Sequence, residues 1–325
     1  MSEQRQAPVV VITGSTRGLG LALAQAFLER GCQVLVSGRG TEAVREALGQ
    51  LGPHGGRLGG QACDVTDPAQ VGALWDGAVR RCGRVDIWIN NAGVGQDYLR
   101  AWELPTEEVI RMVETNVLGV MHGSRVAMRG MRAQGGGAIY NMEGWGSDGK
   151  RRSGLTVYGT TKRAVRYFTR TLADEAAIDS KARADAEGGP APGSGAPAQE
   201  PAAPGSDGDV VESTPDGDAG AAAAAPAGVL VGTLSPGMMV TDFLLGPMER
   251  MADADRMRRV VNILGDRPET VAAFLADKIL SNRRNRAHFA WLTGAKVIGR
   301  FLRAALRRGA LRRDLFASGP GRAAG

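Results

Sequence analysis

The chain has 325 residues, 43% of them hydrophobic, which is ample for one large α/β core. Its formal net charge at pH 7 is +6, and no aromatic residues interleave with its C-terminal arginines, so we expect no nucleic-acid binding. The three cysteines show no paired spacing, which argues for a reducing compartment. The three histidines show no metal-ligand spacing, which argues against a metal site. No apolar run of about 20 residues is present, which argues against a membrane span.

The first predicted element is a buried parallel strand near residues 8–13, an apolar and β-branched run. It begins within about seven residues of Met1, so we expect no secretory or transit segment. A glycine turn, Thr13-Gly14-Ser15-Thr16-Arg17-Gly18-Leu19-Gly20, follows the strand and opens a helix that ends at Gly31. Strand, glycine turn and helix form the first unit of a Rossmann-type fold, in which the phosphates of a dinucleotide lie at the helix N-terminus.

The second strand, near residues 33–37, ends at Ser37-Gly38-Arg39. An acidic residue at this place would bind the 2'-hydroxyl of NAD and repel a 2'-phosphate. The chain instead presents Arg39, with Arg17 in the first turn as a second cation. Two guanidinium groups suit a phosphate monoester, which predicts NADPH as cofactor, with NADH as the alternative.

Strands are expected near residues 8–13, 33–37, 60–64, 85–90 and 137–141, with helices between them. This alternation predicts the α/β class, with a doubly wound parallel sheet in a single domain. The composition of residues 181–228 is rich in alanine, glycine and proline, which predicts a disordered insertion. The sheet resumes near Val229, so the Rossmann domain is expected at 8–180 and 229–281, with a basic helical tail at 282–325.

Tyr158 and Lys162 lie four residues apart on a helix expected to run to about Ile178. Residues i and i+4 share one face of a helix, so the ammonium can lie beside the phenol. A neighbouring cation favours the phenolate and lowers the pKa of a tyrosine toward the working range. The pair therefore predicts a proton donor beside the dinucleotide site.

Apolar residues in the predicted tail line one helical face with arginines opposite, including Val297, Ile298, Phe301 and Leu302. This pattern favours an interfacial helix attracted to anionic lipid or to an acidic partner. A helix packed on its own domain or on a second subunit would show the same pattern, and the sequence leaves both open.

Six motifs in order resemble the short-chain dehydrogenase/reductase family. They are Thr13–Gly20, Cys63-Asp64-Val65-Thr66-Asp67, Asn90-Asn91-Ala92-Gly93, Asn116, Tyr158 with Lys162, and Ser235-Pro236-Gly237. A narrower resemblance is to the chlorophyll(ide) b reductases of the non-yellow-colouring type, carried by Asn141-Met142-Glu143-Gly144-Trp145-Gly146-Ser147, by Met238-Met239-Val240-Thr241-Asp242 and by 262–272.

The resemblance implies roles for particular residues. Tyr158 is expected to donate the proton, Lys162 to lower its pKa and to bond the nicotinamide ribose, and Asn116 to hold a water in the proton relay. The cofactor contacts that it implies are Thr13, Gly14, Ser15, Arg17, Gly18, Leu19, Gly20, Arg39, Asp64, Val65, Asn90, Ala92, Gly93, Lys162, Pro236, Gly237 and Thr241.

One departure concerns the serine that the wider family places about thirteen residues before the tyrosine. That position is Trp145, with Gly144 just before it, and the nearest hydroxyl is Ser147. The chlorophyll(ide) b reductases also carry a glycine-rich stretch here, so the departure supports the narrower resemblance but leaves the group that polarises the carbonyl unassigned.

The implied reaction is reduction of the 7-formyl group of chlorophyll(ide) b to 7-hydroxymethyl, the first step of chlorophyll b degradation. The implied setting is the stromal face of the chloroplast thylakoid, with the cytoplasm as the alternative because no transit peptide is visible. The implied partner is a light-harvesting complex or a paralogous reductase subunit, in a homo- or hetero-oligomer. Pliable apolar residues after the last strand, among them Met238 and Met239, suit a large flat ligand. A general short-chain carbonyl reductase and a non-catalytic partner subunit remain as alternatives.

Overall fold

Seven parallel strands form one sheet in the order β3-β2-β1-β4-β5-β6-β7. The computed structural model describes residues 7–188, 228–241 and 254–306. The strands are β1 (Val9–Ile12), β2 (Gln33–Gly38), β3 (Leu58–Ala62), β4 (Ile87–Asn90), β5 (Gly136–Met142), β6 (Gly228–Ser235) and β7 (His288–Ala290). The strand order reverses beside β1, between β2 and β4, and in open α/β sheets this reversal is where a crevice for ligand forms at the carboxyl ends of the strands.

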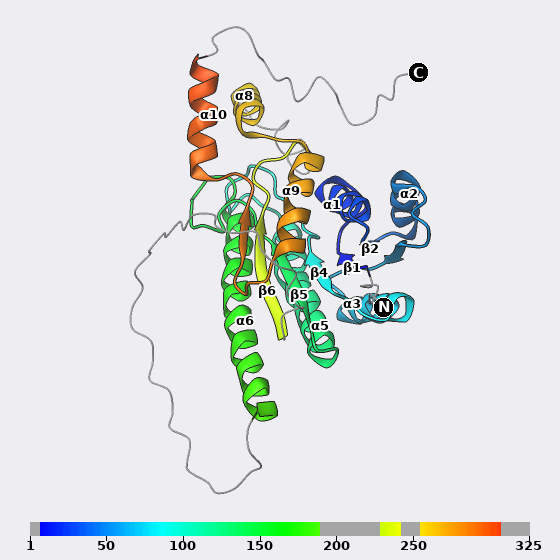
Figure 1. The fold of residues 1–325 in the computed structure, drawn as a ribbon. Helices are drawn as coiled ribbons and strands as arrows, with labels where there is room; N and C mark the ends of the chain where they lie inside the picture. The colour runs from blue at the N-terminus through cyan, green and yellow to red at the C-terminus, as the bar shows by residue number, and fades with distance from the viewer. Residues whose placement is uncertain (1–6, 189–227, 242–253, 307–325) are drawn as a thin grey trace, which may run out of the picture.

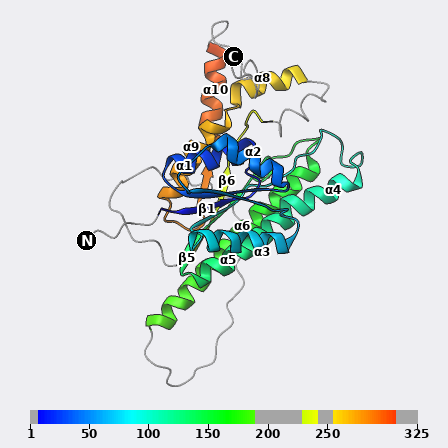
Figure 2. The ribbon, with the colours of Figure 1, turned by 90° about the vertical axis from the view of Figure 1, so that its right-hand side faces the viewer.

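Helices cover both faces of the sheet, as Figure 2 shows with the sheet seen near its edge. One layer holds α1 (Gly18–Glu29), α2 (Thr41–Leu51) and α9 (Pro268–Ser281). The opposite layer holds α3 (Pro68–Cys82), α5 (Gly119–Ala133) and α6 (Thr156–Gly188), with α4 (Thr106–Val113) leading through the π-helical turn η1 (Glu114–Leu118) into α5. The helices α8 (Ala254–Leu264) and α10 (Gly294–Leu306) lie beyond the carboxyl edge of the sheet (Figure 1).

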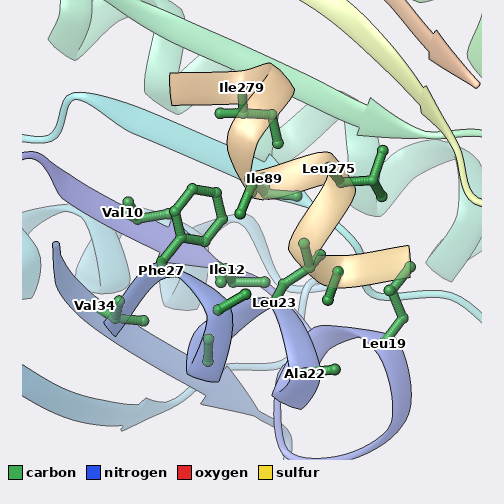
Figure 3. Close-up of a cluster of buried hydrophobic side chains, with 14 of the residues drawn as sticks. Val10, Ile12, Leu19, Ala22, Leu23, Phe27, Val34, Ile89, Leu275 and Ile279 are labelled. Atoms are coloured by element: carbon green, nitrogen blue, oxygen red, sulfur yellow. The ribbon is translucent and has the colours of Figure 1, made fainter. Parts of the chain in front are cut away.

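The hydrophobic core beneath α1 and α9 fixes the position of the glycine turn. Phe27 and Leu23 of α1 and Leu275 of α9 are fully buried and pack over Ile12 of β1 (Figure 3). Full burial of a side chain of this size contributes roughly 1.5–3 kcal/mol. This apolar packing holds α1 against the sheet, so that its N-terminus meets the end of β1.

The predicted doubly wound parallel sheet is confirmed, and the five predicted early strands coincide with β1 to β5 within a few residues. The sheet also resumes at β6, which pairs with β5 from Gly228 to Leu234. The predicted disordered insertion, residues 181–228, overlaps the end of α6, because that helix continues past Ile178 to Gly188. The rest of the insertion, residues 189–227, lies outside the described residues.

The seventh strand lies inside the stretch that the sequence assigned to the tail. β7 pairs in parallel with the end of β6, with Thr233 opposite His288. A three-residue strand that carries a histidine gives no apolar run in the sequence, so only the pairing with β6 reveals it. The sheet domain therefore extends through Ala290, and the helical part of the tail begins at Gly294.

Candidate active site

The turn between β1 and α1 is bound tightly to the segment that follows β4. The amide of Asn91 donates to the carbonyls of Thr13 at 3.0 Å and Gly14 at 2.8 Å. The hydroxyl of Thr13 accepts from the backbone amides of Asn91 and Ala92, both at 3.1 Å. Asn91 therefore fixes the path of the glycine turn, although the sequence indicated no role for its side chain.

Two glycines of the turn leave no room for a side chain. Gly14 has a φ of +61°, and a β-carbon added to it would lie 2.7 Å from Cα of Ala92. A β-carbon on Gly20 would lie 2.4 Å from the Gly14 carbonyl oxygen. These close approaches pack the turn tightly against the start of α1, which is the role that glycines have in a dinucleotide phosphate site. Leu19 is buried beneath the turn, where it supports α1.

The ends of β1 and β2 meet, so the two candidate 2'-phosphate ligands share one edge of the sheet. The amide of Ser15 donates to the Ser37 carbonyl at 2.8 Å, and the amide of Ser37 donates to the Ser15 hydroxyl at 2.9 Å. Arg17 and Arg39 next to these contacts are both exposed. Within the described residues neither arginine has a carboxylate in ion-pair distance, so both guanidinium groups are available to an anion.

The candidate residues after β3 and β4 differ in where their side chains lie. Asp64, half-buried, accepts from the amide and hydroxyl of Thr66 at 3.0 Å and 2.9 Å, which sets the turn, and Val65 is buried. Asn90 is buried in a network in which its amide donates to Asn141 at 2.7 Å and its oxygen accepts from the Trp88 indole at 2.8 Å. Any contact of Asn90 with a cofactor therefore has to come from its backbone.

The segment after β6 lies over the glycine turn. Pro236 is buried, and Gly237 has a φ of +74° with no room for a side chain against Leu292. A β-carbon added to Gly18 would lie 3.7 Å from the γ-methyl of Thr241. Thr241 thus approaches the glycine turn, and the cofactor contact that the resemblance implies for it stays a prediction. Of the pliable apolar residues that the sequence places after this strand, those from Phe243 to Met251 lie outside the described residues.

Tyr158 and Lys162 lie in the first two turns of α6, and both are buried. The Lys162 Nζ lies 5.8 Å from the centroid of the Tyr158 ring and donates to the carbonyl oxygen of Met142 at 3.2 Å. The helix thus places phenol and ammonium side by side, and the carbonyl at the end of β5 holds the ammonium.

Burial changes the pKa of both groups in opposite directions. It lowers the pKa of Lys162 to about 8, while the charge of Glu143 acts in the opposite sense. It raises the pKa of Tyr158 well above its ordinary value, and the neighbouring Tyr98 adds to the rise. The sequence predicts a lowered pKa for this tyrosine, and the structure instead gives a raised one.

Asn116 lies in the π-helical turn η1 and is fully buried. Its side chain forms a reciprocal pair with the backbone of Val94, donating at 2.9 Å and accepting at 2.8 Å, and it also donates to the Thr161 hydroxyl at 3.2 Å. Gly93 lies between the two polar side chains, since a β-carbon on it would be 3.3 Å from the Asn116 oxygen and 3.7 Å from Lys162 Nζ. The structure thus brings Asn116, Lys162 and Gly93 together.

Glycine occupies the place beside the phenol. A β-carbon added to Gly144 would lie 2.2 Å from the Tyr158 hydroxyl oxygen, so no side chain fits there. Ser147 is buried and donates to the Glu143 carboxylate at 3.0 Å, and its backbone amide closes a turn onto the Gly144 carbonyl at 3.1 Å. Trp145 is 42% exposed. The loop therefore directs the Ser147 hydroxyl toward Glu143 and not toward the phenol of Tyr158.

A buried carboxylate lies behind this loop. The Glu143 side chain is 1% exposed, and its Oε2 lies 3.6 Å from Arg166 and 4.0 Å from His288. The Oε1 atom has no hydrogen-bond partner among the described residues. A buried charge needs compensation, and here it comes from Ser147, Arg166 and the nearby Lys162.

Gln96 is a further site residue that sequence reasoning missed. It is 3% exposed, its oxygen accepts from the Tyr158 backbone amide at 2.6 Å, and its nitrogen donates to the Gly154 carbonyl at 2.8 Å. A helix leaves its first amides unpaired, so Gln96 caps α6 from the loop after β4. Because Gln96 lies 62 residues before Tyr158, no local pattern in the sequence links the two residues.

No group of histidine, cysteine, aspartate and glutamate side chains among the described residues has the arrangement of a metal site. None of the helices in the described ranges combines the length and the apolar character needed to cross a bilayer.

Comparisons with known proteins agree with this arrangement. The model of the family described as short chain dehydrogenase matches residues 8–180. Chlorophyll(ide) b reductase NOL, chloroplastic, from Oryza sativa subsp. japonica is 32% identical over 299 residues, which span 90% of this chain and 73% of the rice protein. The crystal structure of an actinorhodin polyketide ketoreductase with NADPH has a TM-score of 0.67 at 23% identity and covers 91% of this chain and 99% of its own. A 3-ketoacyl-(acyl-carrier-protein) reductase from Brucella melitensis, complexed with NADH, has a TM-score of 0.66 at 22% identity and covers 90% of this chain and 99% of its own.

Proposed function

Because the chain belongs to the short chain dehydrogenase family of NAD(P)H-dependent oxidoreductases, we propose that it reduces the 7-formyl group of chlorophyll(ide) b to a 7-hydroxymethyl group. The observation that carries a carbonyl reduction is the convergence of Tyr158, Lys162 and Gly93 at the carboxyl edge of the sheet, beside the glycine turn. The substrate follows from the rice relative, whose name states it and whose likeness spans most of both chains.

The residues of the glycine turn fit a nicotinamide cofactor. Gly14 and Gly20 allow the close backbone contacts that shape the turn, and the N-terminus of α1 favours negatively charged phosphates. We propose NADPH, because Arg17 and Arg39 both lie beside the end of β2, and the residues that directly follow this strand, Arg39 and Gly40, include no acidic residue that could bind a 2'-hydroxyl. When bound, the reduced cofactor supplies a hydride to the carbonyl carbon.

The chain's own residues then handle the proton. Tyr158 donates its phenolic proton to the carbonyl oxygen as charge develops there. Lys162, held by the Met142 carbonyl, places a positive charge beside the phenolate that remains. Asn116 orients the backbone of Val94 and thereby the position of Gly93 between the two polar groups.

The raised pKa of Tyr158 affects the proton transfer. Burial disfavours the phenolate, so the tyrosine stays protonated at neutral pH and its proton transfer has to be assisted by charges in the site. Negative charge then forms on Tyr158 only during the reaction, where Lys162 is the nearest cation that the site provides. Transition-state stabilisation of this kind depends on charges that are already in place.

The test is reduction of chlorophyllide b by the purified protein, followed by the visible spectrum of the pigment, with NADPH and NADH in turn. Tyr158→Phe should lower kcat by a factor of about 10²–10⁴, since general acid catalysis contributes that much. Cofactor binding by this variant should be unchanged. Intact turnover in Tyr158→Phe would refute the assignment of the proton donor.

A non-catalytic partner subunit is the second candidate, and one observation favours it. The Ser147 hydroxyl faces Glu143, so no serine of the described loop points at the place where a substrate carbonyl would lie beside Tyr158. Turnover by the purified chain alone separates the two, because a recruiting subunit would bind pigment and leave it unreduced.

The cellular setting is also a proposal. The rice relative is named as chloroplastic, which supports a chloroplast location, and we propose the stromal face of the thylakoid.

On α10 the apolar residues Ile298, Phe301, Leu302 and Leu306 are 63%, 43%, 59% and 85% exposed. This face suits peripheral contact with a membrane or with a light-harvesting or paralogous subunit. Flotation with anionic vesicles should be lost in a Phe301→Ser, Leu302→Ser variant that keeps its activity on soluble pigment.

A further inference from the structure

A pocket of about 460 Å³ opens between the loop after β4 and the loop before α6, lined by Tyr98, Arg100, Glu103, Arg152, Ser153 and Gly154. Gln96 ties both loops to the first turn of α6, through the Gly154 carbonyl and the Tyr158 amide. The phenol of Tyr98 is close enough to contribute to the pKa rise at Tyr158. The pocket therefore adjoins the candidate proton donor.

Arg152 is the half-buried cation of this pocket. Its guanidinium carbon lies 5.1 Å from the centroid of the Tyr98 ring and 5.8 Å from that of Trp145. One terminal nitrogen lies 3.9 Å from the sulfur of Met257, a weak acceptor. Within the described residues no carboxylate lies in ion-pair distance of Arg152.

The neighbouring cations differ from Arg152 in this respect. Lys150 forms an ion pair with Asp148 at 2.7 Å. Arg100 lies 3.9 Å from Glu103, which also accepts from the Arg100 backbone amide at 2.9 Å. Among the described residues that line the pocket, Arg152 is thus the cation that contacts aromatic rings and has no carboxylate in ion-pair distance.

Such an arrangement suits recognition of a carboxylate. A guanidinium that lies over aromatic rings interacts with them through its face, which leaves the N–H groups at its edge for a planar, bidentate acceptor. Partial burial strengthens such a pair relative to one in water. Hydrogen bonds to charged groups contribute roughly 1.5–3 kcal/mol, enough to change affinity at least tenfold.

We propose that Arg152 forms a subsite for a free carboxylate of the substrate, at the rim of the pocket that Tyr158 adjoins. This inference rests on the proposed function and restricts its preferred substrate to pigments with a free carboxylate. Chlorophyllide b carries a free propionate, whereas chlorophyll b carries the same group as an ester, which has no charge to pair with a guanidinium. The protein therefore prefers the free acid to the ester, and Trp145 and Tyr98 position the cation for it.

The test compares chlorophyllide b with its methyl ester in wild type, Arg152→Gln and Arg152→Lys. Arg152→Gln should raise KM for the free acid tenfold or more with little change in kcat, and it should change KM for the ester less than twofold. Arg152→Lys should restore part of the preference, because it keeps the charge but loses the bidentate geometry. Arg151→Gln is the matched control: this neighbouring arginine is exposed, lines no part of the pocket, and should leave both values unchanged.

Equilibrium binding of both pigments, measured by fluorescence quenching with oxidised cofactor present, separates this inference from the proposed function. Binding that prefers the acid through Arg152, without reduction of either pigment, would support the subsite and refute the proposed activity. Reduction of acid and ester with equal KM in wild type, or an equal loss for both in Arg152→Gln, would overturn the subsite and leave the activity standing.

Discussion

Gly144 lies directly against the hydroxyl of Tyr158, so that a β-carbon added to the glycine would be 2.2 Å from the phenolic oxygen. The same β-carbon would lie 3.1 Å from Cγ of Lys162. The loop after β5 therefore contacts Tyr158 and Lys162 through the backbone of Gly144, without an intervening side chain. This contact explains the glycine at position 144, which directly precedes Trp145, the residue at the position where the wider family has a serine.

Gly144→Ala should lower kcat about a hundredfold or more. The added methyl group has to push the Tyr158 ring aside, and a displacement of about 1 Å of a catalytic group costs roughly that much. Steady-state kinetics with cofactor binding measured in parallel checks the result, because cofactor affinity should change little.

Gly72→Ala is the matched control for this substitution. Gly72 lies in α3, and an added β-carbon there meets no atom within 4 Å. Alanine is the better helix former, so the control should keep full activity and gain up to about 1 kcal/mol of stability. Equal activity in both variants would contradict the contact between Gly144 and Tyr158.

The buried ammonium of Lys162 should make the stability of the cofactor-free protein depend on pH. Its pKa is about 8 in the folded state and has an ordinary value of 10.5, so between these values the unfolded chain binds more protons than the folded one. Stability contributed by this group is therefore lowest below pH 8 and rises as pH increases toward 10.5. The full difference is at most about 3 kcal/mol.

Lys162→Met, which has no titratable group, provides the comparison. Urea unfolding of both proteins from pH 7 to 10.5 should show the free energy of wild type rising relative to that of the variant. A constant difference across this range would show that the lysine is not desolvated as the structure has it.

Glu143 should set the pH range of activity through Lys162. Burial lowers the pKa of Lys162, and the charge of Glu143 partly offsets that effect. Glu143→Gln removes the charge and keeps the shape, so the alkaline limb of the kcat/KM profile should move to lower pH. Glu143→Asp keeps a carboxylate and should move the limb less. A purely structural role would lower activity in both variants without any change in the limb.

Arg39 should discriminate between the two nicotinamide cofactors. Arg39→Ser removes a guanidinium from the edge beside Ser37, and KM for NADPH should rise tenfold or more because a charged hydrogen bond is lost. KM for NADH should stay within twofold of wild type, since it carries no 2'-phosphate. Arg45→Ser, on the exposed face of α2 where Arg45 pairs with Glu42, is the control. An equal effect of Arg39→Ser on both cofactors would place the residue outside the 2'-phosphate site.

Several site features were predictable from the sequence because they depend on local geometry. Tyr158 and Lys162 share a helix face by virtue of their spacing, and the β1 turn needs glycine wherever the backbone has a positive φ or a close neighbour, as at Gly14. The alternation of strands and helices also determined the parallel sheet, since a parallel pair requires a crossover.

The tertiary structure decided what depends on residues far apart in the chain. Gln96 caps α6 across 62 residues, Ser147 turns toward Glu143, and β7 is a strand only because β6 lies beside it. The pKa of Tyr158 also belongs to this group, because burial by distant elements raises it in spite of the lysine one turn away. Local spacing specifies which groups can meet, whereas desolvation and long-range hydrogen bonds depend on the packing of the whole domain.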